Sequence, residues 1–124
     1  MPKLKSTTEM GKEHEEFIAR LYSWDKAKRS LSSGASHHAP IDVVSDSMVI
    51  ECESTESQSY RLRLSFWQEV VDKAYNMKQP MLAIRFRDPD NNRHVDLVVM
   101  DAHDYTVDRE QLDAFRKEAL GEME

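Results

Sequence analysis

The chain has 124 residues, enough for one domain of ordinary size, and 40% of them are hydrophobic, enough for a modest core. Its formal net charge of −6 argues against a protein that binds nucleic acid through overall charge. The single cysteine excludes an internal disulfide and a zinc site built from several cysteines. No apolar run suits a transmembrane helix or a signal peptide, so we expect a cytoplasmic protein without a membrane partner.

The negative charge is concentrated near the C-terminal end. Residues 101–124 carry eight acidic and three basic side chains, which leaves fifteen acidic and fourteen basic ones in residues 1–100. Local charge decides whether a phosphate backbone can approach a surface, so DNA binding by the first hundred residues stays possible. The basic residues there form three groups: Lys26, Lys28 and Arg29; Arg61 and Arg63; Arg85 and Arg87.

The N-terminal segment predicts a helix followed by a loop. Ser6-Thr7-Thr8-Glu9 has the spacing of a capping box, so the helix should begin near Thr7. His14 is expected to flank the core and not to bind a metal. Residues 23–40 are rich in Ser and predict a loop, entered through a short strand. The apolar stripe of the helix contains Met10, His14, Phe17, Ile18 and Leu21.

The stretch 41–53, IDVVSDSMVIECE, predicts a β-hairpin. If Asp46 and Ser47 form a two-residue loop, Asp42 lies directly opposite Glu51, with Cβ atoms about 4.5–5.5 Å apart. Two carboxylates at that distance repel unless a cation or a proton lies between them. Because Mg²⁺ binds through a few carboxylate oxygens, the hairpin is a candidate metal site; the alternative is an acidic face that is only solvated.

The second half of the chain predicts two helices and two strands. A capping box at Ser65-Phe66-Trp67-Gln68 should begin a helix that ends before Pro80, and Arg61 and Arg63 should share one face of the extended segment before it. Strands are expected at 81–86 and 95–100, joined by a turn. An acidic last helix, capped by Asp108 and Gln111, is expected at about 108–120. This order predicts a single α/β domain, residues 1–124, with a small mixed β-sheet flanked by helices.

Four pieces of the chain occur in the order and with the spacing of one family's motifs. They are Gly11-Lys12-Glu13-His14-Glu15; Arg29 with Ser33-Gly34-Ala35-Ser36; Ile41-Asp42-Val43-Val44 with Ile50-Glu51-Cys52-Glu53; and Gln79-Pro80-Met81-Leu82-Ala83-Ile84-Arg85-Phe86. This ordered set resembles the PD-(D/E)XK nucleases, and within them the Holliday junction resolvases of archaeal and phage type. The resemblance implies a restriction-endonuclease-like αβββαβ core. It also implies an Mg²⁺-dependent endodeoxyribonuclease that acts as a homodimer on branched DNA, with Mn²⁺ as a possible substitute ion.

The resemblance assigns roles by position. Asp42, Glu51 and the backbone carbonyl of Cys52 would ligate the ion, and Glu15 would reach it from the first helix. The helical wheel alone does not single out Glu15, so Glu13 and Glu16 stay open as alternatives. A phage-encoded member would act in the host cytoplasm. The residues implied to hold DNA phosphates are Arg29, Ser36, Arg61 and Arg63.

One catalytic position departs from the family. Glu53 stands where the resemblance implies a lysine that stabilises charge on the phosphate and helps to orient or deprotonate the attacking water. Three explanations are open. The chain is a natural variant in which a second cation or another side chain, such as Lys73, replaces the lysine; or a nuclease inactivated by one introduced change; or a natural DNA-binding relative without cleavage. We favour the second explanation. A less selective nuclease of restriction or repair type is a further alternative.

Overall fold

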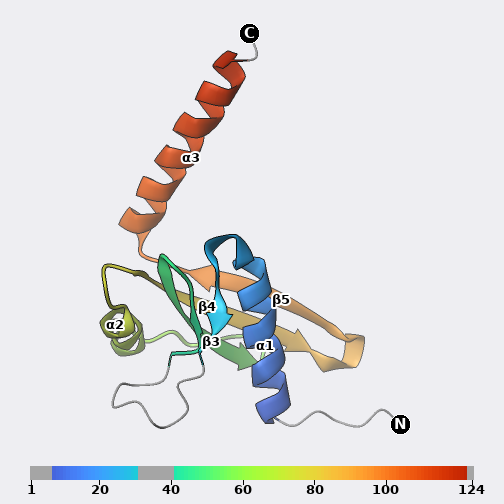
Figure 1. The fold of residues 1–124 in the computed structure, drawn as a ribbon. Coiled ribbons are helices and arrows are strands. Elements are labelled where there is room, and N and C mark those ends of the chain that lie inside the picture. Colours follow the sequence, from blue (N-terminus) through green and yellow to red (C-terminus); the bar gives the residue numbers. More distant parts are fainter. Residues whose placement is uncertain (1–6, 31–40, 123–124) are drawn as a thin grey trace.

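The computed structural model describes residues 7–30 and 41–122. The predicted fold class is confirmed, because the described residues form a mixed sheet of five strands flanked by the first two helices, with a third helix beyond the sheet (Figure 1). The elements in chain order are α1 (Thr7–Leu21), η1 (Ser23–Asp25), β1 (Lys28–Arg29), β2 (Val43–Val44), β3 (Met48–Thr55), α2 (Leu64–Lys73), β4 (Gln79–Asp88), η2 (Pro89–Asn91), β5 (Arg93–Val99) and α3 (Ala102–Glu122).

The strands lie in the sheet in the order in which they occur in the chain, β1-β2-β3-β4-β5. Neighbouring strands are antiparallel except for β3 and β4, which are parallel. Parallel strands need a crossover connection, and α2 provides it. This crossover brings the end of α2 back to the sheet beside β3, where the candidate site lies.

The two faces of β3 meet different helices. Successive strand residues point to opposite faces of a sheet. Ile50 is fully buried in a core cluster with Ile18 of α1, and Cys52 packs against the same cluster. Glu51, between them in sequence, lies beside Lys73 of α2 instead. Glu51 therefore faces the layer of α2, while α1 packs against the opposite face of the sheet.

Two of the three predicted helix starts are wrong. α1 begins at Thr7, as predicted. α2 begins at Leu64, because Arg63 is its N-cap residue: the backbone of Arg63 is extended, and its carbonyl accepts the first hydrogen bonds of the helix. Ser65 therefore lies inside the first turn. α3 begins at Ala102 and not near 108, because the Asp101 side chain caps it by accepting bonds from the next backbone N–H groups.

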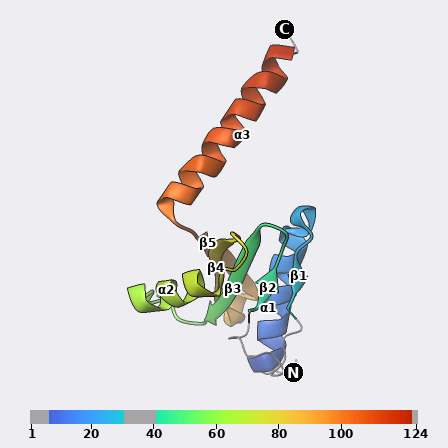
Figure 2. The same ribbon diagram turned by 60° about the vertical axis from the view of Figure 1, so that its left-hand side comes forward.

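α3 is 21 residues long and stands away from the sheet, as the two views in Figures 1 and 2 both show. Its first turns stay close to the body, since Gln79 donates a hydrogen bond to Asp108 at 3.3 Å. Across residues 7–30 and 41–122, no helix combines the length and the apolarity that crossing a membrane requires.

Candidate metal centre

The hairpin forms with the predicted two-residue loop. Val43 pairs with Ile50, and the backbone N–H of Ser45 donates to the carbonyl of Met48 at 2.9 Å, which closes the loop. One further step along this register places Asp42 opposite Glu51, on the same face of the sheet.

The tip of this hairpin is fixed by Asp25 of η1. Its carboxylate accepts hydrogen bonds from Ser45 Oγ at 2.6 Å and from the backbone N–H and the hydroxyl of Ser47 at 3.0 and 2.5 Å. Burial alone would raise the pKa of Asp25, but these hydrogen bonds bring that pKa below its ordinary value. The register that sets Asp42 against Glu51 is thus held from outside the sheet.

Asp42 lies between two other carboxylates, those of Glu15 and Glu51. Its Oδ2 accepts a hydrogen bond from the backbone N–H of Cys52 at 2.8 Å. Glu15 of α1 and Glu51 of β3 both interact with Asp42 at hydrogen-bonding range. Burial and the Asp42 charge raise the pKa of Glu15, and they raise the pKa of Glu51 to about 7. Near neutral pH, protons compete for this group as a cation would.

Two basic side chains form ion pairs with the carboxylates of Glu51 and Glu15. Lys73 Nζ lies 3.3 Å from Glu51 Oε1, and Arg29 Nη2 lies 3.5 Å from Glu15 Oε2. The Glu51 side chain is only 7% exposed. Its Oε1 is buried and makes no hydrogen bond of normal geometry, although Lys73 is close. The negative charge that a divalent ion would neutralise is therefore neutralised here by Lys73 and Arg29.

The donor chemistry fits a hard divalent ion, but the arrangement is not that of a formed site. Carboxylate oxygens are the donors that Mg²⁺ and Mn²⁺ prefer. Within the described ranges, however, no three His, Cys, Asp or Glu side chains are placed as a group that could hold a metal ion. Binding would require the pairs Lys73–Glu51 and Arg29–Glu15 to open.

Glu53 and Cys52 complete the surroundings of Asp42. Burial and Asp42 raise the pKa of Glu53, and Lys73 opposes this rise, so Lys73 acts on both glutamates of the strand. Burial raises the pKa of the Cys52 thiol, which keeps it protonated. A contribution of Cys52 through its backbone carbonyl, as the resemblance implies, does not depend on that thiol.

The residues expected to hold DNA differ in how far they are exposed to solvent. Arg61 lies exposed in the connection between β3 and α2, and Arg63 is the exposed N-cap of α2. Arg29 is half-buried and paired with Glu15. Ser36 lies outside the described residues, as do the rest of the Ser/Gly motif and His37 and His38.

Arg85 and Arg87 are not a phosphate-facing pair. Arg85 is 6% exposed and makes two bonds to Asp96, from Nε at 2.8 Å and from Nη2 at 3.2 Å. Arg87 forms an ion pair with Glu56 at 3.6 Å. Asp96 and Glu56 neutralise the charges of these two arginines, so the expectation that this cluster helps a phosphate backbone to approach is wrong.

Sequence reasoning missed the buried polar network around Asp96. His14 is 1% exposed, as expected of a core residue, and its ring nitrogens lie 3.5 Å from Asp96 Oδ1 and 3.3 Å from Ser54 Oγ. His94 Nδ1 lies 2.9 Å from the other oxygen of Asp96. This network fixes α1, and with it Glu15, against strands β3 and β5. The only sequence signal was the polar His14 within an apolar stripe.

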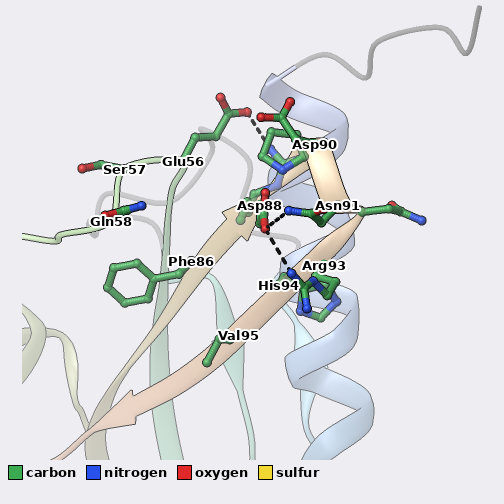
Figure 3. A pocket seen from close by; sticks show the side chains of 13 residues that line it. Glu56, Ser57, Gln58, Phe86, Asp88, Asp90, Asn91, Arg93, His94 and Val95 are labelled. Carbon is green, nitrogen blue, oxygen red and sulfur yellow. Dashed lines mark hydrogen bonds and ion pairs between the residues drawn. The ribbon is translucent and has the colours of Figure 1, made fainter.

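A hollow at the far end of the β4–β5 hairpin is a separate feature (Figure 3). It lies between residues 56–58 and 86–95, and ion pairs and hydrogen bonds inside it join Asp88 with Arg93 and with Asn91. None of the carboxylates around Asp42 lines it. The candidate site is therefore the half-buried carboxylate cluster around Asp42 and not this hollow.

No protein-family model, curated protein or solved structure matches this chain.

Proposed function

We propose that the chain is an Mg²⁺-dependent, structure-selective endodeoxyribonuclease that acts on branched DNA such as Holliday junctions. The observation that carries this proposal is the meeting of Glu15, Asp42 and Glu51, which come from a helix and two strands far apart in the sequence. Carboxylates rarely converge in a half-buried place without a function, because each raises the energy of the others.

In this proposal Asp42, Glu51 and Glu15 hold the ion, together with the carbonyl of Cys52. The ion, Mg²⁺ or Mn²⁺, supplies charge stabilisation at the phosphate and makes a water molecule more acidic. Asp42 keeps its orientation through the N–H of Cys52. With a cation at Glu15, Arg29 would be free to bind a DNA phosphate.

The contact of Lys73 with Glu51 favours the natural-variant explanation over an introduced inactivating change, with Lys73 taking the part of the lysine that Glu53 lacks. Its ammonium reaches the cluster from the last residue of α2 and acts electrostatically on both Glu51 and Glu53. Released from Glu51, it donates to a phosphate oxygen and stabilises the negative charge that develops during hydrolysis. Glu53 then accepts a hydrogen bond from the attacking water. Arg61 and Arg63, exposed beside α2, hold the flanking phosphates.

A second candidate is a DNA-binding domain that does not cleave. The closed pair between Lys73 and Glu51, and the lack of a metal-holding group in the described residues, both favour it. In that case the carboxylate cluster and Lys73 form a structural network, and exposed arginines alone contact DNA.

One assay distinguishes these functions. A synthetic four-way junction and a linear duplex of matched sequence are incubated with the chain, with and without Mg²⁺, and both binding and cleavage are measured. Cleavage of the junction alone, dependent on Mg²⁺, supports the proposal. Equal cleavage of both substrates indicates a less selective nuclease of restriction or repair type. Binding without cleavage indicates the second candidate.

A further inference from the structure

Two turns are bound to the tip of the β2–β3 hairpin, residues 45–47, at one end of the sheet (Figure 1). The first is η1, where the carboxylate of Asp25 holds the tip and its backbone carbonyl accepts the N–H of Asp46 at 2.9 Å. The second is the turn after α2, since the backbone N–H of Gln79 donates to the carbonyl of Ser47 at 2.7 Å. Both turns therefore have fixed positions against the same short tip.

The turn after α2 holds Met77 in a conformation that methionine rarely adopts. The backbone N–H of Lys78 donates to the carbonyl of Tyr75 at 3.0 Å, which closes a four-residue turn. Its two central residues, Asn76 and Met77, have φ values of 52° and 63°. Such a turn favours Asn followed by Gly, because most side chains are strained at positive φ. Met77 takes the place of that glycine, and its side chain is fully exposed. A strained residue that buries nothing points to a function outside the fold.

Trp24, on η1, is a second large side chain that the fold leaves in solvent. It is 74% exposed, and its ring lies tilted against that of Tyr22, with the ring centroids 6.1 Å apart. The hydrogen bonds of Asp25, the next residue, fix the backbone that carries it. An exposed indole on a fixed backbone is a preorganised surface for a flat ligand, and any nucleobase can stack on it.

The charge at this end of the sheet suits a polyanion. The segments 20–28, 45–47 and 75–79 carry four basic and two acidic side chains, in a chain whose formal net charge is −6. Asp108 of α3, which binds Gln79, still leaves the balance positive. Positive charge beside exposed aromatic side chains is typical of proteins that bind nucleic acid through its bases. The basic side chains that lie exposed here are Arg20, Lys26 and Lys28.

The tip of the hairpin also lies close to the carboxylate cluster. Glu51 follows Ser47 by four residues, which corresponds to about 13 Å along an extended strand. This separation is similar to the width of the DNA major groove, about 12 Å. A DNA strand with a phosphate at the cluster therefore has neighbouring bases within reach of the two turns.

We propose that Trp24 and Met77 bind the bases at the branch point of branched DNA, where the stacking of base pairs is interrupted. Trp24 stacks on an exposed base, and Met77 inserts between neighbouring bases, as apolar side chains do in proteins that kink DNA. The inference deepens the proposed function and rests on its DNA binding, but it does not depend on cleavage.

The test is binding of the full chain to a synthetic four-way junction and to a linear duplex of matched sequence, without divalent ions so that neither is cleaved. A 2-aminopurine base beside the branch point reports loss of stacking as a rise in fluorescence. The intact chain should raise this fluorescence at least about twofold. Trp24→Ala and Met77→Gly should each raise the Kd for the junction about tenfold and reduce the fluorescence rise, with the Kd for the duplex unchanged.

Three further variants separate base contact from folding. Glycine adopts a φ of 63° without strain, so Met77→Gly should unfold at the same urea concentration as the intact chain or at a higher one. Trp24→Phe keeps an aromatic face and should retain junction binding. Phe115→Ala is the matched control, because it removes an aromatic ring that is 69% exposed in the second half of α3 and should change neither reading.

Each failure has its own signature. Junction binding that Trp24→Ala and Met77→Gly leave unchanged overturns this inference, and the proposed function stands. An equal loss of binding to junction and duplex also overturns it, since the two side chains would then contact DNA without recognising its branch point. A chain that binds neither DNA overturns both the inference and the proposed function.

Discussion

Lys73 Nζ lies 3.3 Å from Glu51 Oε1, and this pair joins the last residue of α2 to the middle of β3. Both side chains are largely buried, at 23% and 7% exposure. A buried charge left without its partner is strongly destabilising, so neither residue can lose the other without a replacement. A divalent ion at Glu51 and a phosphate at Lys73 are replacements of the right charge. The pair therefore links metal binding to substrate binding.

Lys73→Met should lower the kcat of Mg²⁺-dependent junction cleavage by about 10²–10³-fold, the usual effect of removing one group that stabilises transition-state charge. It should also raise the pKa of Glu51 above about 7, because Lys73 is the cation that lowers it. Cleavage rates and a titration followed by NMR measure the two effects. Lys117→Met, at an exposed position of α3, is the control. Unchanged cleavage together with an unchanged Glu51 pKa would exclude the assigned role.

Glu51 makes the stability of the fold depend on pH. Burial and Asp42 raise its pKa from 4.5 to about 7, so the folded state holds a proton that the unfolded state has released. The resulting stabilisation is fully present below pH 4.5 and is lost as pH rises through about 7, by up to about 3 kcal/mol at about 1.4 kcal/mol per pKa unit. Glu51→Gln should remove this fall in urea unfolding above pH 6.5, where the titration of His14 no longer offsets it. Glu110→Gln, on exposed α3, should retain it.

The same proton should compete with Mg²⁺. Because a carboxylate must lose its proton to bind a metal, Mg²⁺ affinity should rise about tenfold between pH 6 and 8, as Glu51 titrates near 7. Calorimetric titration of Mg²⁺ at the two pH values measures the ratio and the proton released. Asp42→Asn should abolish binding at both values. A pH-independent affinity for Mg²⁺ would mean that the ion binds elsewhere.

The local parts of the site could be predicted from the sequence. A two-residue loop between Val-rich and Ile-rich runs fixes the hairpin register, and the register sets Asp42 against Glu51. The choice among the glutamates of α1 could not be made, because the helical wheel does not say how the helix crosses the sheet. The contact of Glu15 with Asp42 depends on the buried network that fixes α1.

The contacts made by other elements lay beyond sequence reasoning. Lys73 meets Glu51 only because the crossover helix α2 ends beside β3, which depends on how the helix packs and not on spacing. Arg85 was grouped with the basic clusters because its pairing with Asp96 and its contact with Phe17 depend on how β5 and α1 pack, which the sequence does not show. The start of α3 was missed because Asp101 and Asp108 are both suitable caps, and only the end of β5 decides between them.

Glu53→Lys tests the position that departs from the family. The new ammonium would lie near Asp42 and Glu51, and it should raise Mg²⁺-dependent cleavage by about 10²–10³-fold. Because Lys73 already acts at this place, the gain should be smaller in the intact chain than in Lys73→Met. Rates for the four combinations form a double-mutant cycle that measures this coupling. Glu110→Lys makes the same charge change on α3 and should leave cleavage unaltered. Unchanged turnover in Glu53→Lys, with and without Lys73, would contradict the role given to position 53.

His14 should make stability depend on pH in the opposite sense to Glu51. Burial, and then the Arg85 charge, lower its pKa from 6.5 to about 4, so the folded state keeps His14 neutral. This stabilisation is present above pH 6.5 and is lost as pH falls through about 4, by up to about 3 kcal/mol. Between pH 4.5 and 6.5 the two slopes offset each other, and the intact protein should show little dependence there.

His14→Gln should expose the slope of the carboxylates whose pKa is raised, Glu51 above all. The variant should lose about 1–3 kcal/mol at pH 7, because Asp96 and Ser54 lose a buried polar partner. Its remaining stability should then fall as pH rises from 4.5 to 7, where the intact protein is nearly flat. Urea unfolding at half-unit steps of pH measures both curves, and His103→Gln, at an exposed position of α3, is the control. If the His14→Gln curve were parallel to that of the intact protein, His14 would not be the buried neutral group that opposes Glu51.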